Sequence, residues 1–230
     1  MMGIGTIINC LAIIIGGIIG LLFGKLINDS MADTLTKAMG LCVIFIAIND
    51  AVENSLANGN STMMVICFII GTIIGELLKL SQHLENFGEW LKKKTHSEKD
   101  DLFVEGFVNA SMTVCIGAMA VMGAISDGIF HNPDILIVKA LLDFIIIVVM
   151  SATLKKGCLF SFIPVLIFQG SITLLSGFIA PYLTDLALTY LSICGSMLIF
   201  CVGVNLIRPK TFNVVNMLPT ILFSVIYALL

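Results

Sequence analysis

Two ionisable side chains interrupt a long apolar stretch and could carry chemistry inside a membrane. Asp143 lies in the apolar run Ile135–Leu154, and Lys139 precedes it by four residues. Residues four apart on a helix share one face, so the carboxylate and the ammonium can pair. Asp143 is also deep in the run, about 12 Å along a helix axis from its start. A charge at that depth costs at least about 2.5 kcal/mol on insertion scales, and such residues commonly mark ion or substrate paths.

Two interpretations of this pair stay open. In one, Asp143 lines a translocation path and exchanges a proton or a cation there, with Lys139 as its partner or competitor. In the other, the pair is structural, and each charge satisfies the other inside a helix bundle. The interpretations differ in whether transport, or only stability, depends on the Asp143 carboxylate.

Three amides and one further carboxylate complete the set of candidate site residues. A buried amide needs hydrogen-bond partners, which it finds either in a solute or on a neighbouring helix. The carboxylate, Glu105, stands at the start of an apolar stretch, where it acts as a gate or as an interfacial cap. The predicted substrate- or ion-binding residues are therefore Asp143, Lys139, Asn109, Asn9, Gln169 and Glu105.

The sequence favours neither catalysis nor metal binding. The three histidines lie in polar connections, and the seven cysteines lie in apolar segments without a CxxC pair. Paired catalytic carboxylates, a Ser/Lys dyad and an HExxH helix are all missing from the sequence. We therefore expect no enzyme activity, no cofactor and no metal. A net charge of -3 gives no reason to expect nucleic acid as a partner.

The elements that position these residues are long apolar stretches. A soluble domain carries about 25% charged residues, whereas this chain of 230 residues has 12% charged and 58% hydrophobic residues. We predict an all-α, polytopic membrane helix bundle that forms a single integral membrane domain over residues 1–230. Eight stretches long enough to cross a bilayer are expected at about 4–23, 32–52, 62–78, 103–126, 135–154, 159–180, 186–207 and 213–230.

The polar connection 79–101 predicts a helix that lies on the membrane. Leu84, Phe87 and Leu91 recur at steps of three and four residues, which gives an amphipathic helix. Trp90 and the lysines 92–94 suit the headgroup region. An interfacial connector is the simpler interpretation of this segment.

The basic residues predict the orientation of the chain. Of the twelve Lys and Arg residues, all but Lys139 lie on or beside four connections. These are the connections between stretches one and two, three and four, five and six, and seven and eight. By the positive-inside rule these connections are cytoplasmic, so both termini lie outside. The opposite connections are acidic, which slightly favours a cation or a cationic solute. They carry Asp50, Glu53, Asp127, Asp134 and Asp185.

A weak internal similarity at an offset of about 100 residues predicts a repeat. The segment 5–9 resembles 106–109, 37–38 resembles 139–140, and 71–74 resembles 170–173. An inverted three-helix repeat would then relate repeat one, about 1–94 with the amphipathic helix, to repeat two, about 103–181. Residues 186–230 would add two further helices. Inverted repeats are typical of transporters, with sites between the two copies.

Small residues predict close helix packing. Gly16, Gly20 and Gly24 recur every fourth residue in the first apolar stretch, and Gly117 lies in the fourth. Such a strip lets another helix approach closely. We expect it to form the interface of a homodimer or, within one chain, to pack against the stretch 103–126.

Several motifs resemble one family of membrane proteins. They are GTIINCLAIIIGGIIG from Gly5, EGFVNASMTVCIGAMAVMGAISDG from Glu105, KALLDF from Lys139, IPVLIFQGSITLL from Ile163 and NVVNMLP from Asn213. They resemble the YqgA/YdfK-type bacterial inner-membrane proteins, the domain of unknown function 554 family, over nearly the whole chain. The resemblance implies a multi-pass protein of the bacterial plasma membrane, and it implies no particular activity.

Two hypotheses for function follow. The first is a small secondary transporter or ion-conducting protein that works as a homo-oligomer on a small solute or ion. The second is a membrane scaffold or accessory subunit that transports nothing. The second predicts that Asp143, Asn109 and Gln169 pack in a dry core that no water-lined cavity reaches.

Overall fold

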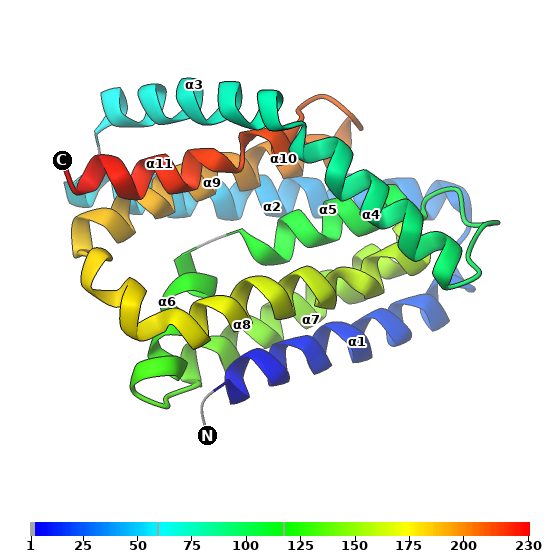
Figure 1. The fold of residues 1–230 in the computed structure, drawn as a ribbon. Coiled ribbons are helices and arrows are strands. Elements are labelled where there is room, and N and C mark those ends of the chain that lie inside the picture. The colour runs from blue at the N-terminus through cyan, green and yellow to red at the C-terminus, as the bar shows by residue number, and fades with distance from the viewer. Residues whose placement is uncertain (1–2, 59, 117) are drawn as a thin grey trace.

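The computed structural model describes residues 3–58, 60–116 and 118–230, and its regular structure is helical throughout these ranges (Figure 1). The predicted all-α fold is therefore confirmed. The helices are α1 (Ile4–Gly24), α2 (Asp29–Asn58), α3 (Ser61–Leu78), α4 (Leu80–Lys94), α5 (Phe103–Cys115), α6 (Ala118–Ile129), α7 (Asp134–Leu154), η1 (Lys155–Ser161), α8 (Phe162–Ile179), η2 (Ala180–Tyr182), α9 (Asp185–Ile207), α10 (Val214–Met217) and α11 (Pro219–Ala228).

Five helical stretches are long and apolar enough to cross a membrane. They are Ile4–Gly24, Ser30–Leu56, Ser61–Leu78, Asp134–Tyr182 and Asp185–Ile207. A sixth is added if the bent pair α5–α6 counts as one span. The stretch Asp134–Tyr182 contains both α7 and α8, which run in opposite directions along the bundle (Figure 1). Length and composition thus give about five candidate spans, fewer than the eight that the sequence predicts.

The outer surface of the bundle is apolar, as a bilayer requires. Large side chains point away from the core, such as Phe45 at 65% exposure and Leu174 at 74%. A soluble monomer rarely exposes contiguous apolar patches of this kind. Lipid would cover them at no cost, so the packing agrees with a membrane protein.

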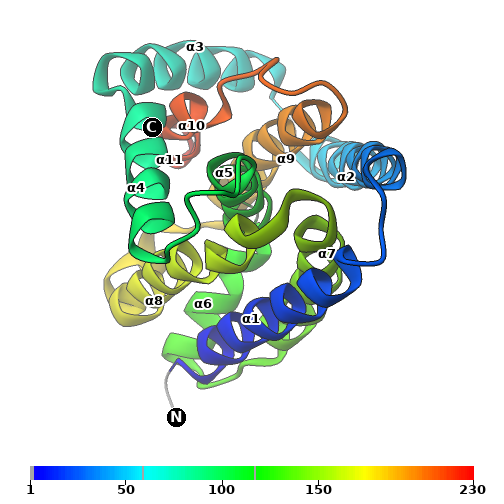
Figure 2. The ribbon, with the colours of Figure 1, turned by 90° about the vertical axis from the view of Figure 1, so that its right-hand side faces the viewer.

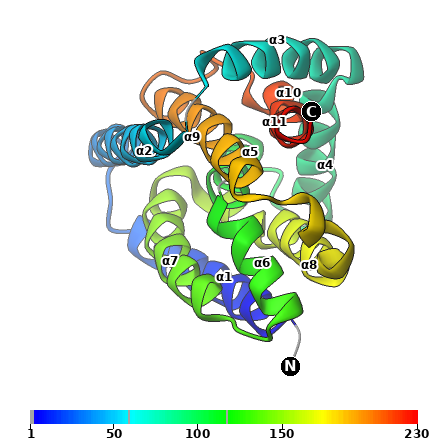
Figure 3. The same ribbon diagram turned by 90° about the vertical axis from the view of Figure 1, so that its left-hand side faces the viewer.

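The helices form two groups around α5. Figures 2 and 3 look along the bundle from its two ends, and both place α1, α6, α7 and α8 on one side and α2, α3, α9 and α11 on the other. The most extensive helix contacts are those of α1 with α7 and of α2 with α9. This packing gives the predicted inverted repeat no support. In two matched copies, the α1–α7 contact would have a counterpart between α2 and α5–α6, whereas α2 packs chiefly on α9.

The glycine strip of α1 packs within the chain. A Cβ atom added at Gly16 would lie 2.9 Å from the Phe144 carbonyl oxygen, and one at Gly24 would lie 2.8 Å from that of Ala152. One at Gly20 would press on the backbone of Val148. The expected partner, 103–126, is therefore corrected to α7. Gly117, the fourth packing glycine that the sequence indicates, lies outside the described residues.

The fourth apolar stretch is a broken helix rather than one continuous helix. α5 ends at Cys115, and the next residue, Ile116, has extended backbone angles of φ -83 and ψ 133. An extended residue cannot continue the i to i−4 hydrogen-bond ladder, so the chain leaves the helix there. α6 then runs from Ala118 to Ile129, bent by 61° from α5. The helix end at Cys115 consequently lies inside the bundle.

Two acidic residues expected in an outer connection lie inside α2. The helix continues to Asn58, so it includes Asp50 and Glu53. Asp50 is half-buried, and its carboxylate accepts a hydrogen bond from the Ser196 hydroxyl in the middle of α9. Asp127 likewise lies in α6 rather than in a turn, and it is fully buried.

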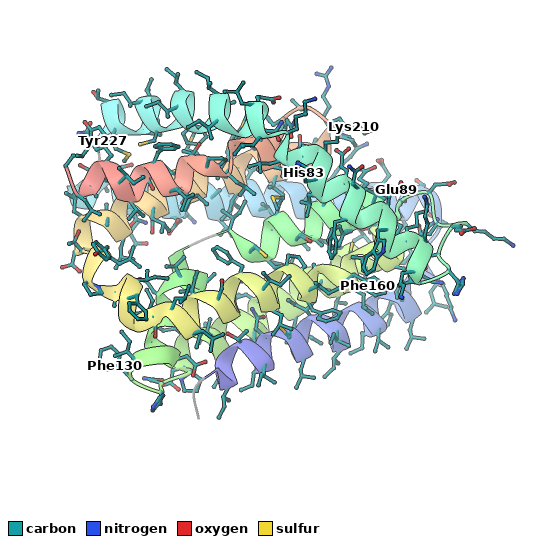
Figure 4. The ribbon with its side chains drawn as sticks, viewed as in Figure 1. His83, Glu89, Phe130, Phe160, Lys210 and Tyr227 are labelled. Atoms are coloured by element: carbon teal, nitrogen blue, oxygen red, sulfur yellow. The ribbon has the colours of Figure 1, made fainter. Side chains whose placement is uncertain are left out.

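The predicted amphipathic helix is present as α4, at one end of the bundle. Leu91 of α4 packs with Phe103 and Phe107, while Trp90 is 53% exposed. In Figure 4, Glu89 and Lys210 lie towards this end, and Phe130 and Tyr227 lie at the opposite end. We call the end that carries α4 the basic end. α1 begins and α11 ends at the opposite end (Figure 1).

Candidate functional site

Four of the six predicted site residues meet inside the bundle. Asn9 comes from α1, Lys139 and Asp143 from α7, and Gln169 from α8. Each side chain is buried, with at most 6% of its residue's surface exposed. Helices that are distant in sequence thus bring these polar groups into one cluster, which we call the central cluster.

Hydrogen bonds connect the members of the central cluster. The Lys139 ammonium donates to Asp143 Oδ2 at 2.5 Å, as its i, i+4 spacing predicts. Asn9 Nδ2 donates to the same oxygen at 3.0 Å and to Gln169 Oε1 at 3.3 Å. A single carboxylate oxygen therefore joins α1 to α7, and the Asn9 amide extends the network to α8.

The broken helix supplies a further ligand to the cluster. Lys139 Nζ also donates to the carbonyl oxygen of Val114 at 2.7 Å. Val114 is in the last turn of α5, where carbonyl groups have no partner within the helix and carry partial negative charge. The ammonium is thus held by a carboxylate and by the end of a helix dipole. This set of oxygens could equally hold a small cation.

Two atoms of the cluster keep unused hydrogen-bonding capacity. Asn9 Oδ1 and Gln169 Nε2 are buried and find no partner among the described residues. The first is an acceptor and the second is a donor. Because buried polar atoms are nearly always hydrogen-bonded, these two atoms suit water or a small polar solute.

The other two predicted site residues lie elsewhere. Glu105 and Asn109 are on α5, and both line a cavity of about 880 Å³ at the basic end. We call it the basic-end cavity after its place in the bundle; its wall carries lysines, such as Lys155 and Lys156, and carboxylates, such as Asp100. Glu105 and Asn109 also line a second cavity, of about 550 Å³, beside α4. They therefore stand apart from the central cluster, towards the basic end of the bundle.

Among the α7 residues that line the basic-end cavity, Ser151 is the nearest in sequence to Asp143. This residue lies eight positions after Asp143 on the same helix. At 1.5 Å per residue, the two side chains are separated by about 12 Å along the axis. Neither of the two cavities is lined by a residue of the central cluster.

Sequence reasoning missed two elements of this region. The Val114 carbonyl is a backbone group, and only the break after α5 makes it available. Asp127 is also absent from the predicted set, because Asp-Gly at positions 127–128 is typical of a turn. The only sequence feature that points to Asp127 is its position directly after the uncharged run 106–126, which is long enough to form a helix.

Comparison with known proteins decides the family. The profile of a family described as "Protein of unknown function (DUF554)" matches residues 4–229, almost the entire chain. The chain belongs to the DUF554 family. The predicted resemblance is thereby confirmed.

Two relatives of this DUF554 chain match it over nearly their full lengths. One is the "Uncharacterized protein YqgA" of Escherichia coli (strain K12), 28% identical over 97% of this chain and 95% of the relative. The other is the "Uncharacterized membrane protein YdfK" of Bacillus subtilis (strain 168), 27% identical over 95% and 92%. No solved structure matches the chain. The name of the second relative agrees with the apolar surface of the bundle, and neither name specifies an activity.

The central cluster of this DUF554 chain combines titratable and neutral polar groups. It contains one acid, one fixed cation and two amides, and its members are held by named hydrogen bonds. Protonating the Asp143 carboxylate would remove the charge that holds Lys139 on one side. The ammonium would then keep only the Val114 carbonyl.

Proposed function

We propose that this DUF554 protein is a small secondary transporter or ion-conducting membrane protein whose path passes Asp143. The observation that carries the proposal is the buried Lys139–Asp143 pair, joined to amides that keep unused capacity. Charged groups inside membrane proteins are expensive and usually functional. A carboxylate as the central ligand favours a cation or a cationic solute.

The proposed topology has eight crossings with both termini outside a bacterial plasma membrane. In addition to the stretches that are long and apolar enough to cross a membrane, α5–α6 would cross as a bent span and Val214–Ala228 as a short one. α7 and α8 would cross separately, in line with their opposite directions. The basic end would then face the cytoplasm, in accordance with the positive-inside rule.

In the proposed cycle, Asp143 alternates between two partners. In one state the carboxylate pairs with Lys139, as it does here at 2.5 Å. In the other, a proton or cation neutralises the carboxylate, and Lys139 relaxes towards the end of α5. The transported proton or cation competes with the Lys139 ammonium for the Asp143 carboxylate. Binding at Asp143 and the position of α7 relative to α5 therefore change together.

One observation favours the alternative, a scaffold or accessory subunit that transports nothing. Neither of the two cavities reaches the central cluster, and the Lys139–Asp143 pair is already satisfied by the protein. In that case the pair would only fix the packing of α1, α5, α7 and α8. As an assembly we propose a homodimer, formed by a face other than the glycine strip, which α7 already occupies.

Flux measurements on purified protein in vesicles test the proposal. Asp143→Asn is nearly isosteric but cannot ionise. In a path it abolishes cation or proton flux, measured with tracer cations and an internal pH dye, while the protein still elutes as a folded species. In either role the substitution strands the buried Lys139 charge, at a cost of about 3–5 kcal/mol, so the loss of flux and not the loss of stability distinguishes a path from a structural pair.

A second substitution separates the two roles. Lys139→Met in the Asp143→Asn background removes the stranded charge and restores stability in either case. Flux stays absent in the double variant if Asp143 is part of the path. A double variant that regains stability and conducts like the parent protein would leave Asp143 with a structural role and would favour the scaffold.

A further inference from the structure

A second buried carboxylate lies beside the first turn of α1. Asp127, on α6, is 0% exposed, and its Oδ2 accepts a hydrogen bond from the Gly5 backbone N–H at 2.9 Å. The first N–H groups of a helix have no partner within it and stabilise negative charge. The other oxygen, Asp127 Oδ1, finds no partner among the described residues. Asp127 Oδ2 is therefore held by a hydrogen bond, whereas Oδ1 can accept a hydrogen bond from a ligand.

Two buried hydroxyl groups lie between Asp127 and the central cluster. Thr6, on α1, follows Gly5 and precedes Asn9 by three residues. Thr173, on α8, follows Gln169 by four residues, and its carbonyl oxygen would lie 2.6 Å from a Cβ atom added at Gly128, the neighbour of Asp127. Along α1 and α8, Thr6 and Thr173 are each about one helical turn from the residues of the Asn9–Gln169 hydrogen bond, towards the end of the bundle where Asp127 lies.

These groups leave a row of buried polar atoms to be satisfied. Among the described residues, eight buried side-chain atoms find no partner, and five of them belong to this region. The five are Thr6 Oγ1, Asn9 Oδ1, Asp127 Oδ1, Gln169 Nε2 and Thr173 Oγ1. Each parent residue is at most 2% exposed. Water, which needs two to four polar partners, fits such a row.

The chemistry of the row suits protons better than metal cations. A hydroxyl group and a water molecule each donate one hydrogen bond while accepting another, so they can pass a proton along. A bare metal cation needs acceptors on all sides. Here Gln169 presents an amide donor, and the Lys139 ammonium already occupies the charged end of the row.

We propose that a proton path runs from the end of the bundle opposite the basic end to Asp143. Its lining consists of Asp127, Thr6, Thr173, Asn9 and Gln169. This inference rests on the proposed function and names the exchanged ion. A proton that reaches Asp127 protonates its carboxylate. Each water or hydroxyl in the row then accepts one proton and releases one, and Asp143 Oδ2 or Oδ1 receives the last. Asp127 gives up its proton to the row and returns to the carboxylate, so only Asp143 changes charge, and the waters and hydroxyls rotate back before the next proton arrives.

Proton uptake by vesicles tests the path. The full chain is reconstituted into phosphatidylethanolamine–phosphatidylglycerol vesicles that contain a pH dye, and valinomycin with a potassium gradient sets an inside-negative potential. Asp127→Asn keeps an acceptor for Gly5 N–H but cannot take up a proton, and it should lower proton uptake by about tenfold or more. Thr173→Val should lower uptake as well, and Thr173→Ser, which keeps the hydroxyl, should restore it.

Asp134→Asn is the matched control. Asp134 is an acidic residue in the first turn of α7 at the same end of the bundle, but it is exposed. This substitution should leave proton uptake unchanged. Equal losses in Asp134→Asn and Asp127→Asn would reduce the effect to surface charge and would overturn the path.

The remaining outcomes separate this inference from the proposed function. Proton uptake that survives both Asp127→Asn and Thr173→Val, in protein that elutes as folded, overturns the path while transport stands. Rubidium or sodium flux that depends on Asp143, without proton uptake, also overturns the path but keeps the proposed function. A parent protein that moves none of these ions overturns both.

Discussion

At the scale of single residues, one oxygen atom holds the central cluster together. Asp143 Oδ2 accepts from both Lys139 and Asn9, which belong to different helices. A carboxylate with two donors on one oxygen is positioned firmly, yet protonation of that same oxygen would disturb both bonds. The arrangement therefore couples the charge of Asp143 to contacts between α1 and α7.

The Asn9 amide should matter for stability because its bonds are buried. Asn9→Leu removes a donor from Asp143 and from Gln169, which leaves polar groups unsatisfied at a cost of about 1–3 kcal/mol. The measurement is the free energy of unfolding of the purified protein in mild detergent. Asn109→Leu is the matched control, because Asn109 is only half-buried and lines a cavity. The same loss of stability in both variants would contradict this account.

At the scale of helices, the contact of α1 with α7 places Asn9 opposite Asp143. The glycine strip sets the distance between the two backbones, because side chains at these positions would meet α7 carbonyl groups. α5 ends where Lys139 can reach its last carbonyls. The site is thus a product of one close helix contact and one helix break.

Gly20→Ala should therefore weaken the bundle. The added methyl group would meet the Val148 backbone and lie 2.8 Å from Ser151 Cβ, and such overpacking costs about 1–3 kcal/mol. Gly177→Ala is the control, since a Cβ atom at Gly177 of α8 would meet nothing within 4 Å. Thermal unfolding in detergent should show a lower midpoint for Gly20→Ala alone. Unchanged midpoints in both variants would mean that α1 and α7 do not pack this closely.

Local patterns predicted the parts of this structure that depend on neighbouring residues. The Lys139–Asp143 pair follows from i, i+4 spacing, and α4 follows from its amphipathic pattern. The break at Ile116 has no proline to announce it, so the Val114 carbonyl could not be predicted. The partner of the glycine strip depends on contacts between distant helices, which one sequence does not encode in any local signal.

Charged residues near helix ends were the other source of error. The sequence places Asp50 near the end of the stretch 32–52, among the acidic residues of an outer connection. The structure keeps it within α2, where the Ser196 hydroxyl on the neighbouring helix provides a partner. Asp127 is expected in a turn, whereas it lies in α6, and one of its two carboxylate oxygens accepts a hydrogen bond from Gly5 N–H at the start of α1. In both cases a hydrogen bond from a distant part of the chain offsets part of the free-energy cost of burying the carboxylate. A sequence pattern does not reveal that hydrogen bond.

At the scale of the whole molecule, the two ends of the bundle differ in charge. The basic end carries the three lysines of the last turn of α4, and Lys155 and Lys156 of η1 line the basic-end cavity there. Asp127 and the start of α1 lie at the other end. A path from Asp127 through Asp143 to the basic-end cavity would thus cross the molecule along α7. This route has a meaning only if these ends face opposite sides of the membrane.

Labelling of single cysteines tests the proposed topology directly. In a background without the seven native cysteines, cysteine is placed at Asn132, Tyr182 or Lys210, all of which are exposed. An impermeant maleimide added to intact cells should label positions 132 and 182, and it should reach 210 only after permeabilisation.

Asn132 precedes the helical stretch that contains α7 and α8, and Tyr182 is its last residue. If that stretch crosses twice, the two positions share a side; if it crossed once, they would label from opposite sides and the count of eight would fail. Labelling of 210 alone from outside would keep the count and reverse the orientation, so that Asp127 would face the cytoplasm.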